Sequence, residues 1–352
     1  MLTFLLRRLG QGLLVLIGVA CTVFLLFNVL PGDPATLLAG QRTDVATKAA
    51  ITADLGLDQP LPLRLLGYLN DVSPLGLHPR DSASVARYGG LSVLLLGDQA
   101  LVLKKPYLRR SFQSNKDVLR ILLDYFPGTM WLALAAMLLA SVVGVALGVL
   151  AALRPQSWLD RALLSTSVLG ISVPSFVAAI AIAATFGFYW SHWTGLSLTG
   201  QLYETDPFTG ERHLVLRNLL LPAIALGVRP LAIITQLTRS SMLDVLSQDY
   251  IRTARAKGLS RRATVLRHAL RNALNPVVTA VSGWLASLMA GAFFIEYIFN
   301  WKGLGTVTLR AVENLDFPLV MGATIFVAAL FVVINIVVDL LYAALDPRVK
   351  VQ

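Results

Sequence analysis

The sequence predicts an all-α polytopic membrane protein with six transmembrane helices, and three observations support this fold class. Hydrophobic residues make up 56% of the 352 residues and charged residues only 14%, a composition too apolar for an ordinary soluble domain. Six stretches are long and apolar enough to cross a bilayer, which takes about 20 residues for about 30 Å of hydrocarbon. The single cysteine, Cys21, excludes a disulfide framework, so we expect helix packing to hold the fold together.

The predicted spans are separated by segments rich in polar and turn residues. In chain order the spans are Leu9–Leu30, Met130–Leu153, Leu163–Trp190, Leu219–Leu237, Val277–Phe299 and Leu319–Leu345. Arg7 and Arg8 precede the first span, as they would in a signal peptide, but the apolar run is too long and lacks a small-residue cleavage site. We therefore expect this span to remain as a helix.

The positions of Lys and Arg predict how the spans are oriented, because in short loops these residues favour the cytoplasmic side. They gather at Arg7–Arg8, Arg154–Arg161, Arg239–Arg271 and Arg348–Lys350, all on one side of the predicted spans. Both termini are therefore expected in the cytoplasm. The net charge of +10 is typical of such loops and favours contact with membrane lipid over binding of nucleic acid.

This topology divides the chain into four parts. They are a first transmembrane helix at 1–30, an external segment at 31–126, a five-helix core at 127–346 that includes a cytoplasmic loop at 239–275, and a cytoplasmic tail at 347–352. The external segment is too long for a plain connector, so we expect it to form a layer of short helices and loops. The second outer segment, Ser191–Arg217, contains a predicted polar turn at "ETDPFTGER".

The segment "DYIRTARAKGLSRRATVLRHALRNALNP", Asp249–Pro276, carries seven Lys or Arg residues between two apolar stretches. Its local signals predict two short helices that meet at Gly258, a residue suited to the left-handed end of a helix. Ser247 and Ser260 are the expected caps, with Asp249 near the positive end of the first helix. The second helix is expected to be amphipathic, with an apolar face made of Leu266, Leu270, Ala273 and Leu274. Taken alone, the segment could be a basic surface helix resting on an anionic leaflet.

The same segment resembles the cytoplasmic coupling loop of ABC importer permeases, in the branch that carries dipeptides, oligopeptides and nickel. Four further stretches resemble this branch in the expected order: "RRLGQGLLVLIGVACTVFLLFNVLPGDP", "GLDQPLPLRLLGYL", "FPGTMWLALAAMLLASVVGVALGVLAAL" and "FIEYIFNWKGLGTVTLRAVENLDFPLVMGATI". The carboxyl-terminal "VVDLLYAALDPRVK" also fits the family's closing pattern. The resemblance implies a type I ABC importer permease fold in a bacterial or archaeal inner membrane. It also implies three kinds of partner: a second homologous permease, two nucleotide-binding ATPase subunits and an external solute-binding protein.

In this family the first short helix of the loop docks on the ATPase subunit. The matching positions are Tyr250, Thr253, Ala254, Arg255, Ala256, Lys257, Gly258 and Leu259. Arg252 stands where the family's glutamate would be, and Thr253 where its first alanine would be, so a glutamate-based contact is not expected here. Charge pairs at an exposed rim add only about 0.2–1 kcal/mol, so shape should set the affinity of docking more than charge.

The sequence contains no pattern that indicates catalysis. It has no G-x-x-x-x-G-K-[ST] loop to bind phosphates, so ATP and Mg²⁺ should be bound by the partner subunits. The histidines at 78, 192, 213 and 268 lack the H-E-x-x-H spacing of a zinc site. We therefore expect no catalytic residue, metal or cofactor in this chain. Two other classes, an ion-coupled secondary transporter and a membrane-embedded hydrolase, would need mid-membrane carboxylates or a nucleophile constellation, which are not apparent.

Small residues at four-residue spacing predict close helix packing. Gly144 and Gly148 form one such pair, and Gly283, Ser287 and Gly291 form a stripe on the fifth span. We interpret both as packing surfaces, with solute contact at Ser287 as the alternative. On the last span, Asn335 and Asp339 lie one turn apart and are interpreted as a structural pair, with a gate as the alternative.

Two residues within the spans are candidates for the translocation pathway. Pro174 removes a helix hydrogen bond and is expected to kink the third span, which makes it a possible hinge. Arg229 lies in the middle of the fourth span beside Pro230. Its charge must face a polar cavity or a partner. It could pair with the second permease, or it could contact the carboxylate of a passing peptide.

The solute class follows from the resemblance only in outline. Peptides are the first choice, with nickel chelates or glutathione-like solutes as the alternative. Direct ligation of nickel would favour a cluster of Met or His residues along the spans, and the sequence has no such cluster. The external segment around Ser73–Lys105 is longer than the family's usual form, and Tyr107–Phe112 replaces the G-D-x-G-x-S pattern.

Overall fold

The structure is a computed structural model that describes residues 2–29, 59–79 and 91–345. The chain forms two compact units. One consists of residues 1–124 with 307–332, and the other of residues 125–306 with 333–351. The predicted tail at 347–352 and much of the predicted external segment lie outside the described residues.

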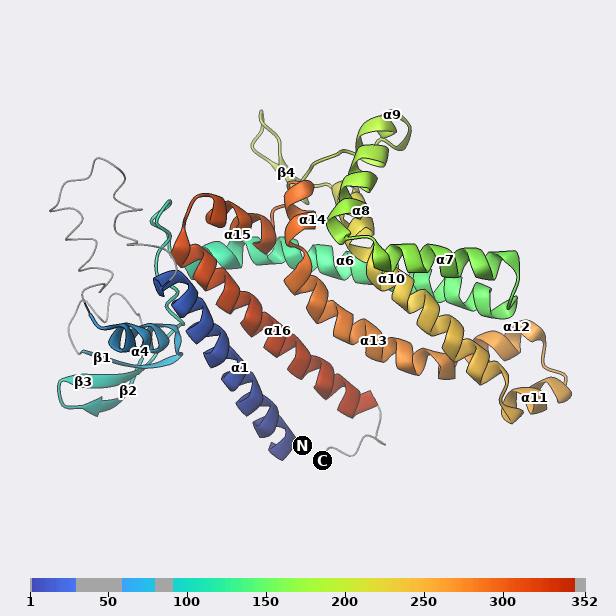
Figure 1. The fold of residues 1–352 in the computed structure, drawn as a ribbon, viewed down its shortest axis with the longest axis horizontal. Coiled ribbons are helices and arrows are strands. Elements are labelled where there is room, and N and C mark those ends of the chain that lie inside the picture. The colour runs from blue at the N-terminus through green and yellow to red at the C-terminus, as the bar shows by residue number, and fades with distance from the viewer. Residues whose placement is uncertain (1, 30–58, 80–90, 346–352) are drawn as a thin grey trace. The chain divides into compact units, whose positions relative to one another are not determined.

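The described residues are mostly helical, and four of their helices are long and apolar enough to cross a membrane. These are α1 (Leu2–Val29), α6 (Val118–Leu153), α10 (Arg217–Leu246) and α16 (Phe317–Leu345). A fifth candidate is a bent pair, in which α7 (Trp158–Ser172) is followed by α8 (Ser175–Ile182) and the π-helix η1 (Ala183–Tyr189). Four of the six predicted spans therefore match single helices, and the third matches the bent pair (Figure 1).

The fifth predicted span, Val277–Phe299, does not form a single apolar helix. Residues Leu270–Gly291 form α13, the chain breaks at Ala292, and Phe293–Ile298 form the short helix α14. Among the described helices, α13 is not one of those apolar enough to count as a span. The reason lies in its sequence, because it begins inside the polar segment with Arg271 and Asn272 and continues with small and polar residues.

The prediction of an all-α chain is also wrong, because the first unit contains a sheet. After α4 (Leu61–Val72), the strands β1 (Leu75–Pro79), β2 (Leu91–Leu96) and β3 (Gln99–Leu103) form an antiparallel sheet in the order β1-β3-β2. Leu75 and Leu91 both pair with Leu103. Each strand has only five or six residues, and the Gly97–Asp98 turn, with φ of 61° at Gly97, joins β2 to β3. Short apolar runs joined by a tight turn favour strands over helices.

Within this first unit, α4 packs against α1 through the rings of Tyr68 and Phe24, whose centroids lie 5.5 Å apart. Helix α1 also lies beside α16 (Figure 1), and at Gly12 a Cβ atom would come within 2.5 Å of Val332. The helix α15 (Leu304–Glu313) ends just before Asp316, which is buried and accepts hydrogen bonds from the Ser111 hydroxyl and the Phe112 amide. The stretch Tyr107–Phe112 thus lies against the start of α16.

The second unit is built around α10, which packs against α7, α8 and α13 (Figure 1). Gly144 and Gly148 on α6 confirm the predicted close packing. A Cβ atom at Gly144 would lie 2.9 Å from the Ile234 side chain, and one at Gly148 would lie 2.6 Å from the Thr235 carbonyl. Helix α6 begins at Val118, well before the predicted span, because Asp117 accepts a hydrogen bond from the Arg120 amide and starts the helix early.

The remaining elements of the second unit are short. Helix α9 (Ser191–Thr194) is followed by a hairpin of β4 (Tyr203–Thr205) and β5 (Arg212–Leu214). The predicted polar turn at "ETDPFTGER" joins these strands, with the Asp206 carboxylate accepting hydrogen bonds from the amides of Phe208 and Thr209. Gly210, with φ of 71°, completes the turn.

Candidate functional site

The basic segment, Asp249–Pro276, folds as the sequence predicts around Gly258. Its first helix is α11 (Asp249–Ala256). Beyond it, the Gly258 amide donates to the Arg255 carbonyl and the Leu259 amide donates to the Ala254 carbonyl. This pattern is a Schellman motif, which requires a left-handed residue, and Gly258 has φ of 83°. A glycine is needed here for its backbone alone, since a Cβ atom would have nothing within 4 Å.

The helix that follows begins as predicted, but the cap of α11 is different. Ser260 caps α12 (Arg261–Ala263), because its hydroxyl accepts a hydrogen bond from the Ala263 amide. Ser247 does not cap α11. It ends α10 instead, and its hydroxyl donates to the Asp244 carbonyl at 2.7 Å. Gln248 occupies the cap position without a side-chain hydrogen bond, so the carboxylate of Asp249 in the first turn is what complements the helix end.

The apolar face of the second helix differs from the prediction. Residues Thr264–Ala269 form the π-helix η2, whose i→i+5 hydrogen bonds shift each side chain relative to an α-helix. Val265 and Ala269 are buried as a result, whereas Leu266, expected on this face, is 51% exposed. Ala273 is buried as predicted, and Leu270 and Leu274 are half-buried.

A small apolar cluster ties the basic segment to the ends of the long helices. Ile251 on α11 is fully buried and packs with Val265 and Ala269 of η2, Ala152 of α6 and Met242 of α10. Burial of one isoleucine side chain contributes about 1.5–3 kcal/mol. Ile251 therefore joins α11 to the ends of α6 and α10.

Polar contacts reinforce the same attachment. The Asn272 side-chain amide donates to the Tyr250 hydroxyl at 2.7 Å, which joins α11 to α13. The Arg261 guanidinium donates to the carbonyl of Leu153, the last residue of α6. These bonds join the two short helices to two longer ones, α11 to α13 and α12 to α6.

The residues expected to dock on a partner lie mostly on the outside of this segment. Tyr250, Thr253, Arg255, Ala256, Lys257 and Gly258 are exposed, and Ala254 and Leu259 are half-buried. Arg252 lies 3.7 Å from Asp249, and both side chains are exposed. The outer surface of the segment thus consists of small residues, the cations Arg255 and Lys257, and the turn at Gly258. The buried Ile251 attaches this surface to the longer helices.

An ion pair that the sequence did not indicate lies close to the basic segment. The Arg239 guanidinium on α10 binds both carboxylate oxygens of Asp160 on α7, with atoms 2.5 Å and 2.8 Å apart. Asp160 is almost fully buried and also accepts a hydrogen bond from the Gln156 amide. A two-pronged pair of this kind fixes geometry as well as contributing energy. It joins the start of α7 to α10.

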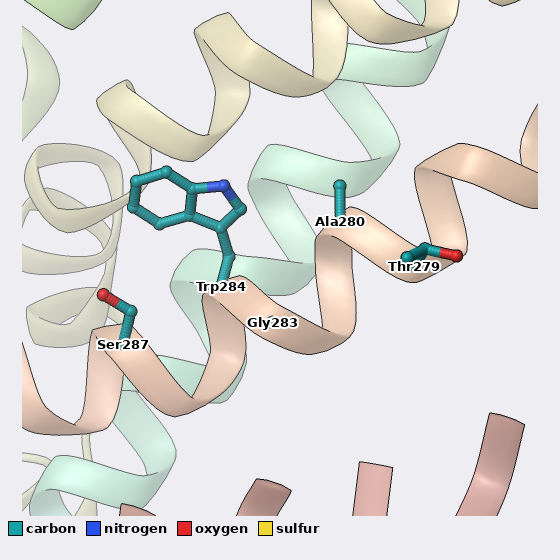
Figure 2. Close-up of a pocket in the computed structure, with 5 residues that line it drawn as sticks. All are labelled: Thr279, Ala280, Gly283, Trp284 and Ser287. Atoms are coloured by element: carbon teal, nitrogen blue, oxygen red, sulfur yellow. The ribbon is translucent and has the colours of Figure 1, made fainter. Parts of the chain in front are cut away.

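A second candidate site is an open cavity of about 370 Å³ along α13. It is lined by Thr279, Ala280, Gly283, Trp284 and Ser287. In Figure 2 the Trp284 ring and the Ser287 hydroxyl project to the same side of α13. Gly283 is exposed, and a Cβ atom there would meet nothing within 4 Å. Within this chain, the stripe interpreted as a packing surface therefore faces open space at Gly283; the surroundings of Gly291 lie outside what is described.

Arg229 is not among the residues that line this cavity, but it contacts Trp284, which does line it. Its guanidinium carbon is 5.9 Å from the centre of the Trp284 ring, and its side chain is exposed. An arginine at the centre of a span costs at least about 2.5–3.5 kcal/mol if it faces lipid. The structure thus brings two predicted pathway residues, Arg229 and Ser287, to one region, and it adds Trp284 and Thr279, which sequence reasoning missed.

The third predicted pathway residue, Pro174, lies elsewhere in the second unit. It caps α8 at the point where α7 and α8 bend by 110°, so the predicted kink is confirmed and is sharper than a bent helix. Pro174 does not line the cavity beside α13. Asn335 and Asp339 are half-buried on α16.

Glu296 is a buried carboxylate that the sequence analysis did not single out. It is fully buried on α14 and accepts hydrogen bonds from the Thr129 hydroxyl and from the amides of Gly305 and Thr306. These amides form the first turn of α15, where a negative charge is favourable. The stretch "EYIFNWKGLG" could have indicated this contact, because an acidic residue precedes a glycine-rich helix start there.

Among the residues that the structure describes, no three His, Cys, Asp or Glu side chains gather closely enough to hold a metal ion.

Comparison with known proteins places these features in context. Residues 144–351 match the family described as "Binding-protein-dependent transport system inner membrane component". Residues 1–86 match the family of N-terminal regions of such membrane components. The chain is 36% identical over 367 residues to the di/tripeptide transport system permease protein DppB of Pseudomonas aeruginosa, with 100% of both chains covered.

Other relatives are similar over their whole length. The dipeptide transport system permease protein DppB of Escherichia coli K12 is 34% identical over 370 residues, with 99% of both chains covered. A putative peptide transport system permease protein of Brucella abortus is 37% identical over 355 residues, again with 99% of both covered. A solved structure of the MetNI methionine ABC transporter has a TM-score of 0.48 and 17% identity, covering 65% of this chain and 97% of that one.

Proposed function

This chain belongs to the family of inner membrane components of binding-protein-dependent transport systems, and on that premise we propose that it forms half of the pore through which di- and tripeptides are imported. It is a transport component and not an enzyme. We propose as partners a second homologous permease, two ATPase subunits that bind ATP and Mg²⁺, and an external binding protein that delivers the peptide.

The proposed topology has six spans in the type I importer arrangement, with α13 as the fifth. In this arrangement α13 faces the pore and not the lipid. This position explains why α13 carries polar residues that lower its hydropathy. The basic segment and both termini lie in the cytoplasm, as expected for loops rich in Lys and Arg. Peptide as the solute is supported by the names of the full-length relatives.

The main support for this proposal is the way in which the basic segment is attached to the longer helices. An exposed turn of small residues is held by Ile251 and by hydrogen bonds to the ends of α6 and α13. Such a surface suits close docking of an ATPase subunit, and its attachment transmits movement of that subunit to the spans. We propose Tyr250, Thr253, Ala254, Arg255, Ala256, Lys257, Gly258 and Leu259 as the docking residues.

Substitution of Gly258 tests this role. In Gly258→Val a β-branched residue would occupy a left-handed position, at a cost of roughly 1–2 kcal/mol, and the angle between α11 and α12 would change. We expect ATP hydrolysis by the reconstituted complex to continue while ATP-driven peptide uptake into proteoliposomes falls sharply. The measurement is the ratio of peptide imported to ATP hydrolysed.

The matched control is Gly258→Asn, because asparagine tolerates left-handed backbone better than other residues with a side chain. This variant should retain most of the coupling ratio. A Gly258→Val complex that assembles and keeps the normal coupling ratio would refute the docking role.

A further inference from the structure

We propose that the cavity beside α13 binds the free carboxylate end of the passing peptide, and that Arg229 is the residue that recognises it. This inference rests on the proposed peptide import. It assigns to the pathway a chemical preference for solutes with a negatively charged terminus, carried by this chain's own residues.

The first argument is the character of the α13 surface. Thr279, Gly283 and Ser287 follow one another at four-residue spacing, so they form a line along one side of the helix. All three are exposed in this chain. The Thr279 hydroxyl donates only within its own helix, to the Asn275 carbonyl at 3.3 Å. A line of small and hydroxyl-bearing residues leaves room for a peptide backbone and offers it hydrogen bonds.

The second argument is the surroundings of Arg229. Helix α10 carries no other charged residue between Arg217 and Arg239. In the described part of this chain, no carboxylate forms an ion pair with Arg229, and its guanidinium lies over the Trp284 ring. By contrast, Arg239 on the same helix is held by Asp160. The Arg229 guanidinium therefore remains available to a group from outside the chain.

The third argument is geometric compatibility. A guanidinium presents paired N–H donors that match the two oxygens of a carboxylate. The guanidinium carbon of Arg229 lies 5.9 Å from the centre of the Trp284 ring, and Trp284 lines the cavity. A cation–π contact with this ring therefore holds Arg229 against one of the residues that line the cavity. Because every peptide has the same carboxylate and backbone, such a site accepts many side chains, as a general peptide pathway must.

Uptake of two matched peptides tests the proposal. One dipeptide has a free carboxyl end and the other has an amidated end, and the pair is chosen so that the partner binding protein binds both. Initial uptake rates are measured in proteoliposomes with the wild-type complex and with Arg229→Gln. We expect the substitution to lower uptake of the free-carboxyl peptide about 10- to 100-fold and to leave uptake of the amidated peptide nearly unchanged.

Arg217→Gln is the matched control, because it removes the same charge from the outer end of the same helix, away from the cavity. It should affect both peptides alike. Equal losses for both peptides in Arg229→Gln, with the complex assembled, would overturn the carboxylate contact and favour a structural pairing with the second permease.

The same experiment separates this inference from the proposed function. If the wild-type complex hydrolyses ATP but imports neither peptide, the proposed function fails before Arg229 is tested. If the wild-type complex imports the free-carboxyl peptide and Arg229→Gln does not change the ratio between the two peptides, only the inference fails.

Discussion

Glu296 illustrates how one buried side chain organises several segments. Its carboxylate accepts hydrogen bonds from α15 and from Thr129, whose hydroxyl in turn accepts one from the Leu304 amide. A buried polar group is costly unless its hydrogen bonds are satisfied, and here three donors meet the carboxyl group. The first turn of α15 is therefore fixed against the beginning of α6.

Gly303 is required beside this carboxylate, because a Cβ atom there would lie 2.3 Å from the Glu296 carboxyl carbon. We predict that Gly303→Ala destabilises the protein by about 1–3 kcal/mol, since the buried carboxylate cannot move without losing its donors. Thermal unfolding in detergent measures the change. Gly67→Ala is the control, because nothing lies within 4 Å of a Cβ atom at this helical position, and it should be neutral or slightly stabilising. A wild-type melting temperature for Gly303→Ala would contradict this account.

At the scale of the elements, a buried lysine lies directly after the last strand of the sheet in the first unit. Lys104 follows β3, and its ammonium donates to the Asp71 carbonyl at 2.8 Å. Burial lowers the pKa of Lys104 to about 8, although the charge of Asp71 opposes this change. In the unfolded chain this pKa is about 10.5. Between these two values the unfolded chain binds more protons than the folded unit, so stability must rise with pH.

We therefore predict that the sheet becomes more stable from about pH 8 to about pH 10.5. Hydrogen exchange of the amides in β2 and β3, corrected for the intrinsic effect of pH on exchange, measures this stability. Lys104→Met should remove the rise, whereas Lys105→Met, at the exposed neighbouring position, should keep it. The same pH dependence in Lys104→Met and in the wild type would show that Lys104 is not its source.

The elements also show what could be predicted from the sequence. Long apolar runs and the glycine-centred turn at Gly258 depend on local sequence, so most spans and the left-handed helix end at Gly258 were predicted. The strands β1, β2 and β3 were missed because apolar runs of five or six residues fit several structures until their pairing is known. Ile251 was missed for a similar reason. Its burial depends on Ala152 and Met242, which are distant in the sequence and unrelated to the pattern of the basic segment.

At the scale of the whole molecule, the candidate pathway is open on one side. The cavity along α13 is lined from this one helix, Arg229 contacts its Trp284, and Gly283 and Ser287 are exposed. A polar surface of this kind is unfavourable against lipid, so we expect a second protein to cover it. The chain contains one copy of the permease core, and the family resemblance implies that a pore needs two.

We predict that the covering protein is a homologous but different permease and not a second copy of this chain. Identical copies would bring two Arg229 guanidinium groups to the same pore, where like charges repel at low effective dielectric. A different permease can instead place neutral groups opposite Arg229, which leaves its guanidinium available to the peptide carboxylate. Native mass spectrometry of the purified complex should therefore find one copy of this 38.1 kDa chain together with one other permease and two ATPase subunits. When this chain is expressed with the ATPase subunits alone, a stable complex that contains two copies of it and imports peptide would contradict the prediction.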